Sequence, residues 1–482
     1  MKLMFLKTRL MLSTILFFST LSTGYTSANN LLSNPLSNNQ LSSNNVQNSP
    51  MKKQIESSNK LSPFEKQLAS KMALDFRYYC PDGAKTSTKR CVDPLTKLPS
   101  ELAEMVTEST IGSVVLFAEN LETTKQIIEL THDLQKAALA SDSGQPLIIS
   151  IDQEGGRVAR LPQATTFAGN MAIGATYQAH GTHFATETTT IIAKELTLLG
   201  INNNYAPVVD VNTNPDNPVI NTRSYSEDPQ QVADLGTAAV IGFQQQGIMA
   251  TLKHFPGHGD THIDSHLGLP LVEHDIETIE QKDLVPFKWA IKHSDPAMIM
   301  TAHIQYPALD NSTIKNISGD DIIRPATMSR KILTDLLRNE MGFKGIIATD
   351  ALDMAGIAHY FDEVTAVAET FVAGADLAVM PFRVREKADI EKFYSFLKAV
   401  AHSIQEKAKQ ETFSLSEITA SIERINHYKA KYIKLPNTPL VEQLAIAEQQ
   451  IAQPQYLALE QTLANNAVNV ISSTKTKTIF GL

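Results

Sequence analysis

The segment KHFPGHGDTHIDSHLGLP, residues 253–270, concentrates groups that can transfer protons. It holds four histidines and two aspartates among turn-forming glycines and prolines. Pro256 and Gly257 interrupt both helical and strand periodicity, so a loop that positions polar groups is expected here. Within it, Asp264 precedes His266 by two residues, close enough on a bent loop for the carboxylate to orient the imidazole and stabilise its charged form. The pattern predicts an acid/base dyad.

The same segment also contains residue types that bind metal ions. Zinc and iron centres use imidazole and carboxylate ligands. Against this alternative, Lys253 would place a positive charge beside the cation, and the ligand spacing matches none of the usual metalloenzyme patterns. The sequence therefore favours proton transfer, with a metal site as the alternative. The residues that such a site would use are His254, His258, His262, Asp264 and His266.

A second candidate for chemistry is Asp350, which follows the apolar run 345–348 with one threonine between. That position delivers a carboxylate to the end of a predicted strand. An N-cap of the following helix is the structural alternative, although Asp353 is the better cap candidate. A carboxylate nucleophile with a separate proton donor is the combination that retaining glycoside hydrolysis needs. The ordinary pKa of histidine, about 6.5, suits His266 to the donor role.

Charged groups that could bind a sugar follow an earlier apolar segment. In IDQEGGRVARLP, two glycines turn the chain and leave Asp152 and Arg160 near the end of a predicted strand. A carboxylate accepts hydrogen bonds from sugar hydroxyls and a guanidinium donates them, so both side chains are expected to bind substrate. Permanent Asp152–Arg160 or Glu154–Arg157 ion pairs are the alternatives. Arg223, in NTRSYSEDP, could likewise bind a sugar or form a permanent ion pair.

Eight short apolar or β-branched segments alternate with longer helix-like stretches, as in repeated β-α units around a parallel sheet. Polar residues follow them at their C-terminal ends, which converge on one face of a (β/α)8 barrel. We therefore predict an α/β fold, a (β/α)8 TIM barrel. A doubly wound open sheet is the alternative, but no Gly-rich phosphate loop follows an early strand. The polar residues are Asp152, Asp210, Asn212, Lys253, His254, His303 and Asp350. The predicted strands span residues 72–79, 111–117, 146–152, 202–211, 249–255, 296–303, 345–352 and 375–381.

Two helix-like stretches illustrate the covering layer. Residues 123–139 and 328–341 carry apolar residues every three or four positions, as helices that cover a barrel do. Ser329 is expected to cap the second helix and Gly342 to end it. Trp289, the single tryptophan, lies among helix-like residues and is expected to pack in the core rather than to stack on a sugar.

The N-terminal region carries targeting signals rather than a fold. Basic residues, the apolar run 10–21 and a Thr-Ser-Ala sequence fit a secretory signal peptide over residues 1–28. The apolar run is shorter than the ~20 residues that span a bilayer, so export with cleavage near Ala28 is expected rather than a membrane anchor. Residues 29–60 are rich in Asn, Ser and Gln, as a flexible leader is. The mature chain is expected to be periplasmic or secreted, without a stable membrane anchor.

Cysteine content and charge limit the remaining possibilities. Cys80 and Cys91 are the only cysteines, and in an exported chain this pair favours a disulfide, with two free thiols as the alternative. The formal net charge is -9, and no Lys/Arg-rich run lies outside the extreme N-terminus. A nucleic-acid partner is therefore not expected.

Five motifs in chain order make this chain resemble the family-3 glycoside hydrolases, in their β-N-acetylglucosaminidase (β-hexosaminidase) branch. The motifs are IDQEGGRVARLP, NTRSYSEDP, KHFPGHGDTHIDSHLGLP, PAMIMTAHIQYPALD and GIIATDALDM. The resemblance covers residues 62–435 and implies a single catalytic barrel, without metal or organic cofactor. It implies Asp350 as the nucleophile, His266 as the proton donor and Asp264 as its partner. The sugar-binding positions that it implies are Asp152, Arg160, Arg223, Lys253 and His254.

The implied substrate is a terminal β-linked N-acetylglucosamine in peptidoglycan fragments (muropeptides) or chitin-type amino-sugar oligosaccharides. Many members that recycle peptidoglycan are cytosolic, whereas the signal peptide here implies wall glycan or scavenged sugars. Residues 456–473 resemble the opening of the second domain of longer members, so 436–482 is expected to be a short C-terminal extension. A β-glucosidase, a phosphorolytic enzyme of the same family and a glycan-binding protein without turnover are the alternatives, since a fold alone does not establish chemistry.

Overall fold

A computed structural model describes residues 60–83, 90–262, 264–265, 267–410 and 413–480, with side chains as far as residue 468. The predicted signal peptide, residues 1–28, and the predicted leader up to residue 59 lie outside the described residues. So does His266.

Eight parallel strands form the central sheet, in the order β10-β1-β2-β3-β4-β5-β6-β9. A parallel bridge between Ala348 and Leu377 joins the two remaining edges, so the sheet closes on itself. Each of the eight predicted segments overlaps one of these strands, and the predicted (β/α)8 barrel is confirmed. The strands are β1 (Met72–Asp75), β2 (Ser113–Val115), β3 (Ile148–Ile151), β4 (Asn203–Asn204), β5 (Met249–Phe255), β6 (Met298–Thr301), β9 (Ile346–Thr349) and β10 (Ala378–Arg383).

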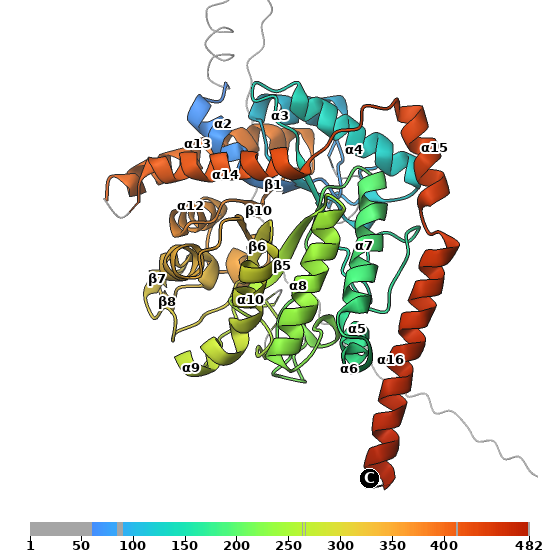
Figure 1. Ribbon diagram of the computed structural model, residues 1–482. Coiled ribbons are helices and arrows are strands. Elements are labelled where there is room, and N and C mark those ends of the chain that lie inside the picture. Colours follow the sequence, from blue (N-terminus) through green and yellow to red (C-terminus); the bar gives the residue numbers. More distant parts are fainter. Residues whose placement is uncertain (1–59, 84–89, 263, 266, 411–412, 481–482) are drawn as a thin grey trace, which may run out of the picture. The chain divides into compact units, whose positions relative to one another are not determined.

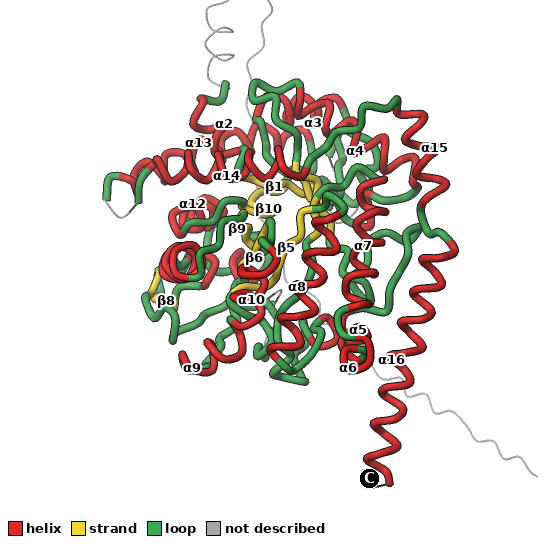
Figure 2. Tube along the Cα trace, viewed as in Figure 1, coloured by secondary structure: helices red, strands yellow, loops and turns green. Residues whose placement is uncertain are grey.

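Helices surround these strands, and Figure 2 shows the strands gathered inside the helical layer. A separate antiparallel hairpin, β7 (Thr313–Lys315) and β8 (Asp321–Ile323), lies between β6 and β9 in the chain. The helices up to the last strand are α2 (Pro63–Ala69), α3 (Ser100–Ser109), α4 (Thr124–Leu139), α5 (Asn170–Ala175), α6 (Tyr177–His180), α7 (His183–Leu198), α8 (Pro229–Gln245), α9 (Ile276–Thr278), α10 (Val285–Ser294), α11 (Ala355–Ala358) and α12 (Glu363–Ala373). After it come α13 (Lys387–Ala408), α14 (Leu415–Tyr432), α15 (Leu440–Gln450) and α16 (Pro454–Phe480).

The helix predicted at 123–139 is confirmed as α4. It buries Ile127, Leu134 and Ala138 at helical spacing, and the Thr123 hydroxyl caps its first turn by accepting the N–H of Gln126. The stretch 328–341 forms a π-helix, η5 (Lys331–Glu340), rather than an α-helix. Ser329 nevertheless accepts the N–H of Ile332, as a cap does, and Gly342 follows with φ +71°.

The prediction that Trp289 packs in the core is wrong. Its side chain is 37% exposed on α10, where its ring lies 4.1 Å from that of His293. Phe287 and Ala290 on the same helix are buried. The helix therefore turns these two residues to the barrel and leaves the indole on its outer side, and Trp289 does not line the cavity described below.

The C-terminal helices pack on the outside of the barrel and belong to the same unit as its strands. Helix α15 contacts α4 and α7, and α16 contacts α5 and α7, beside which it runs in Figure 1. The hypothesis that residues 436–482 correspond to the opening of a second domain remains a prediction. Among the described residues, none of the helices combines the length and apolar character of a membrane span.

Candidate active site

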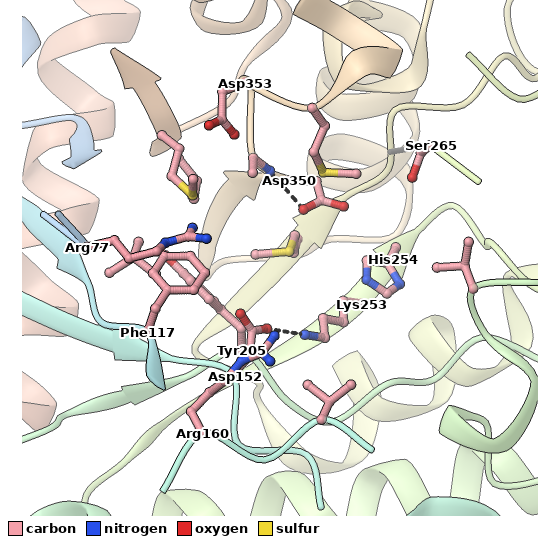
Figure 3. Close-up of a pocket in the computed structure, with 18 of the residues that line it drawn as sticks. Arg77, Phe117, Asp152, Arg160, Tyr205, Lys253, His254, Ser265, Asp350 and Asp353 are labelled. Atoms are coloured by element: carbon pink, nitrogen blue, oxygen red, sulfur yellow. Dashed lines mark hydrogen bonds and ion pairs between the residues drawn. The ribbon is translucent and has the colours of Figure 1, made fainter. Parts of the chain in front are cut away.

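A cavity of about 700 Å³ opens where the C-terminal ends of the barrel strands converge. Figure 3 shows acidic and basic side chains from several of these strands directed into it. Active sites of (β/α)8 barrels form at this face. The predicted site residues that line the cavity are Asp152, Arg160, Arg223, Lys253, His254 and Asp350.

Lys253, at the end of β5, lies at the centre of a charged cluster on the cavity floor. Its side chain is only 2% exposed, and its Nζ lies 2.6 Å from Asp152 Oδ1 and 2.7 Å from Glu154 Oε1. Burial lowers the pKa of Lys253, but the two carboxylates outweigh burial, so the pKa lies above its ordinary value. The ammonium group therefore stays charged and holds both carboxylates in place.

Glu154 connects this lysine to Arg223. The Arg223 guanidinium donates two hydrogen bonds to it, from Nε to Oε2 at 2.9 Å and from Nη2 to Oε1 at 2.7 Å. Burial raises the pKa of Glu154, but Arg223 and Lys253 together bring it well below its ordinary value. A bidentate pair of this kind fixes the plane of both groups.

The alternative ion pairs considered from the sequence are absent among these described side chains. Asp152 pairs with Lys253 instead of Arg160. Arg157 donates to the main-chain oxygen of Val219 instead of pairing with Glu154. Asp152 and Glu154 pair with Lys253 because the barrel brings the end of β5 opposite the turn after β3. The local sequence around either segment does not indicate this proximity.

His254 is oriented by Asp210, which lies beneath it. The main-chain N–H of His254 donates to Asp210 Oδ1 at 3.0 Å, and the ring Nδ1 lies 2.7 Å from Oδ2. Because an ionised carboxylate only accepts hydrogen bonds, Nδ1 carries the proton and Nε2 is the ring nitrogen left for a ligand. Burial raises the pKa of Asp210, but His254 and His258 outweigh it and the pKa is lowered.

The Asp350 carboxylate points into the cavity from the end of β9 (Figure 3). Its Oδ1 accepts the N–H of Ala351 at 2.8 Å, and His303 Nε2 lies 2.9 Å from the Ala351 oxygen. Burial raises the pKa of Asp350, but His254, His303 and the Ala351 amide outweigh it, so the pKa lies below its ordinary value. Asp350 is therefore ionised at neutral pH, as an attacking carboxylate must be.

The expectation that Asp353 caps the next helix is wrong. Helix α11 begins at Ala355 after Met354, without a side-chain cap, so Asp353 lies one position too early. Its carboxylate pairs instead with Arg383 Nη2 at 2.7 Å on the rim of the cavity.

Arg160 presents a buried donor that none of the described residues satisfies. Its Nε is buried and has no hydrogen-bond partner among the described residues, while its main-chain N–H donates to Gln153 Oε1 at 2.7 Å. An unpaired buried donor is costly unless a ligand supplies the acceptor. Because Arg160 lines the cavity, a polar ligand bound there would supply the acceptor (Figure 3).

Two wall residues were not singled out from the sequence. The Arg77 guanidinium lies 3.4 Å from the centre of the Phe117 ring, a cation–π contact, and both residues line the cavity. Arg77 follows β1 and Phe117 follows β2. The rule for polar strand ends missed them because Arg77 falls inside the predicted strand 72–79, which ends at Asp75 in the structure, and Phe117 is not polar.

The loop of the predicted dyad is only partly described. His266 lies outside the described residues, and Asp264 is partly exposed and does not line the cavity. The main-chain oxygen of Asp264 accepts the N–H groups of Leu267 at 2.8 Å and Gly268 at 3.1 Å, which closes a turn. Ser265, between the two predicted residues, lines the cavity. The loop therefore reaches the cavity at Ser265.

The histidines considered as metal ligands are engaged otherwise where they are described. His254 binds Asp210, and His258 Nδ1 and Nε2 lie within hydrogen-bond distance of Thr261 and Ser265. In the described part of the chain, no three His, Cys, Asp or Glu side chains come together as metal ligands would.

A further covalent link lies near the cavity, where Cys80 and Cys91 form a disulfide with their Cα atoms 5.8 Å apart. Cys80 follows β1, and its N–H donates to the Arg385 oxygen at 2.8 Å. The disulfide therefore closes a loop after β1, and the hydrogen bond to Arg385 joins that loop to the segment after β10.

Comparison with known proteins adds to this geometry. Residues 79–427 match the N-terminal domain of glycosyl hydrolase family 3. The chain is similar to β-hexosaminidase A of Pseudoalteromonas piscicida, with 51% identity over 84% of this chain and 67% of that protein. It is also similar to a β-hexosaminidase of Tolumonas auensis, with 37% identity over 54% of this chain and 73% of that protein.

Among solved structures, a family-3 β-N-acetylglucosaminidase from a Paenibacillus species superposes with a TM-score of 0.65 and 32% identity, over 81% of this chain and 69% of that one. The family match covers most of the barrel. It agrees with the geometry of the cavity, which has a carboxylate at a strand end and a charged floor. The chain belongs to glycosyl hydrolase family 3 and is a glycoside hydrolase.

Proposed function

We propose that this glycoside hydrolase is a retaining exo-β-N-acetylglucosaminidase, which releases terminal β-linked N-acetylglucosamine. The observation that carries the proposal is the position of Asp350: its ionised carboxylate faces a floor of paired charges across a single cavity. The similar proteins named β-hexosaminidase and β-N-acetylglucosaminidase support the choice of sugar.

In the proposed reaction, an Asp350 oxygen attacks the anomeric carbon while the bond to the leaving-group oxygen breaks. His266 gives its proton to that oxygen, and a glycosyl ester forms on Asp350. His266 then takes a proton from water, the water oxygen attacks the anomeric carbon, and Asp350 is released as a carboxylate. Asp264 stabilises the imidazolium form of His266 that exists before the first transfer and is restored by the second.

The charged floor would hold the sugar ring during both steps. The carboxylates of Asp152 and Glu154 accept hydrogen bonds from hydroxyl groups, whereas Lys253 and Arg160 donate them. Because these groups are already held by ion pairs or packing, little reorganisation is needed when the sugar binds. In the complex, the sugar would supply Arg160 Nε with the partner that it lacks among the described residues.

The natural substrate that we propose is a peptidoglycan fragment or a chitin-type oligosaccharide outside the cytoplasm. The signal-peptide pattern over residues 1–28 and the Cys80–Cys91 disulfide support export, because disulfides persist in oxidising compartments. Detection of the chain in periplasmic or culture fractions, with an N-terminus near Ala28, tests the location. Recovery of the uncleaved chain from the cytoplasm would contradict it.

The function is tested with the purified mature chain on an aryl β-N-acetylglucosaminide and the matching β-glucoside. We expect a strong preference for the N-acetyl sugar, no effect of chelator, and a free reducing sugar as product in phosphate buffer. A sugar 1-phosphate would instead identify a phosphorolytic enzyme. Preference for the glucoside would overturn the proposed sugar, and chelator-sensitive activity would require a metal. Retention at the anomeric carbon, followed by NMR of the first product formed, tests the double displacement.

A further inference from the structure

Ser265, which lies between the two residues of the proposed dyad, is buried, whereas Leu267, which follows the dyad, is exposed. Its side chain is 1% exposed, whereas that of Leu267 is 76% exposed. Ser265 also lines the cavity of the active site. The loop therefore turns one small polar side chain inward at the position between Asp264 and His266. A buried hydroxyl needs a hydrogen-bond partner, and the identity of that partner shows what Ser265 does.

The hydroxyl of Ser265 faces His258, with Oγ 3.2 Å from Nε2. On the other side of the same ring, His258 Nδ1 lies 2.8 Å from Thr261 Oγ1, whose hydroxyl proton is donated to the His258 oxygen at 3.1 Å. Thr261 Oγ1 therefore accepts from the ring, and the proton of the neutral imidazole is on Nδ1. Nε2 is left as an acceptor, so the Ser265 hydroxyl donates to it.

The neutral state of His258 follows from its surroundings. Burial and the neighbouring His254 lower the pKa of His258, and Asp210 offsets them only in part, so the pKa is about 4. The main-chain N–H of His258 donates to Asp210 Oδ1 at 2.8 Å, the same oxygen that holds the main-chain N–H of His254. The acceptor for Ser265 is thus part of the cavity floor.

The main chain of Ser265 is held from the opposite side. Its oxygen accepts the N–H of Gly356 at 2.9 Å, from α11 shortly after Asp350. A Cβ atom at Gly356 would lie 3.0 Å from the oxygens of both Ser265 and Gly268. At this distance the two oxygens must move by a few tenths of an ångström to admit a Cβ, so glycine gives the loop its close approach to α11.

We infer that Ser265 is a positioning residue that holds the stretch Asp264–Ser265, which directly precedes the proposed donor in the chain, between His258 at the cavity and Gly356 after the nucleophile. The inference rests on the proposed function of His266 as proton donor. It links the placement of the donor to the same Asp210 that orients His254. Ser265 itself does not need to touch the substrate.

The test is Ser265→Ala in the full mature chain, assayed on two substrates. Misplacement of the donor should slow a glycoside with a poor leaving group by about 10-fold to 100-fold, but an activated aryl glycoside by less than about threefold, because an activated group leaves with little protonation. The alkaline limb of the pH profile should also shift. Ser318→Ala, an exposed serine in the β7–β8 hairpin, is the matched control and should change neither rate.

The same substitution in a His266→Ala background separates positioning from a general effect on the fold. If Ser265 acts through His266, Ser265→Ala adds nothing to His266→Ala. Equal loss in both backgrounds, or equal loss on both substrates, would overturn the inference. If His266→Ala itself shows no dependence on the leaving group, the proposed donor role fails. A leaving-group effect for His266→Ala without one for Ser265→Ala refutes the positioning role alone.

Gly356→Ala provides a second and independent variant, since it perturbs the other side of the dock. We expect the same dependence on the leaving group as for Ser265→Ala, with a similar loss of about 10-fold or more on the poor leaving group. Unchanged rates on both substrates would contradict docking against α11. Circular dichroism of both variants shows whether the barrel is intact.

Discussion

The two ends of the barrel each contain a buried cluster of charges, but they differ in how completely these charges are satisfied. At the C-terminal end, Lys253 and Arg223 hold Glu154 beside an open cavity. At the N-terminal end, Asp376 is 0% exposed and accepts hydrogen bonds from Arg338 at 2.7 Å, Ser421 at 2.7 Å and the Ile347 N–H at 2.8 Å. Arg424 also pairs with Asp376.

This difference distinguishes the candidate active site at the C-terminal end from a purely structural cluster at the N-terminal end. The hydrogen bonds of the Asp376 cluster join α14 and the segment before β9 to the base of the barrel. Around the Glu154 cluster, Arg160 Nε has no partner among the described residues, and Asp350 faces the open cavity. Barrel enzymes are expected to carry catalysis at the C-terminal end and stability at the other. Substitutions at the two ends should therefore affect different measurements.

The largest effect is expected at the mouth, for Asp350→Asn. Loss of the attacking carboxylate should lower kcat by about 10⁴-fold or more, while the midpoint of thermal unfolding stays the same or rises. Hydrolysis of an aryl glycoside and a melting curve followed by circular dichroism give both quantities. Asp335→Asn, at an exposed position of η5, is the control. Near-wild-type turnover would remove Asp350 from the nucleophile role.

The opposite result is expected at the base, for Asp376→Asn. Loss of the negative charge leaves the partly buried Arg338 and Arg424 without their counter-ion, so the free energy of unfolding should fall by about 3–5 kcal/mol. Denaturant unfolding measures this change. The folded fraction should retain the kcat of the unaltered protein at low temperature. A selective loss of kcat with unchanged stability would show that the base is not a purely structural joint.

A smaller effect on activity alone is expected for Arg160→Met. Its guanidinium has an unpaired Nε in the free protein, so removing it should cost little stability. A hydrogen bond from a charged donor to the substrate contributes about 1.5–3 kcal/mol, which corresponds to a loss of roughly 10-fold to 100-fold in kcat/KM. Steady-state kinetics and thermal unfolding of the same preparation check both parts. A large drop in stability with unchanged kcat/KM would assign Arg160 to the fold.

The smallest effect concerns Lys429, which is buried on α14 near the base. Burial lowers the pKa of Lys429 to about 7 in the folded protein, against about 10.4 for an unperturbed lysine. Between these values the unfolded chain binds more protons than the folded one, so the contribution of Lys429 to stability rises with pH and is least favourable below pH 7.

Lys429→Met removes this titration. We expect a gain of about 1–2 kcal/mol at pH 7 that disappears as the pH approaches 10. Urea unfolding of both proteins across this range measures the difference, with Lys434→Met, an exposed position, as the control. A constant difference at all pH values would show that Lys429 is charged in the folded state throughout.

The sequence alone was sufficient for the barrel because each strand and helix has a local signal. Eight apolar segments recur at the spacing of β-α units, and the position of Asp152, Lys253 and Asp350 at strand ends predicts that they meet at one mouth of the barrel. The helix at 123–139 has its own periodicity and its own cap at Thr123. These features depend on neighbours within a few positions, which is the range over which a sequence pattern is informative.

Only the tertiary structure decided which charges meet. Glu154 lies three residues from Arg157 but pairs with Arg223 and Lys253, because parallel strands bring their ends together regardless of sequence distance. Trp289 lies outside the core because the rotation of α10 about its axis depends on the neighbouring helices. Ser265 contacts His258 on one side and Gly356 on the other. Gly356 lies 91 residues further along the chain, so no local sequence pattern indicates this contact. Residue types and strand ends are local properties of a chain, whereas pairing is a property of the closed barrel.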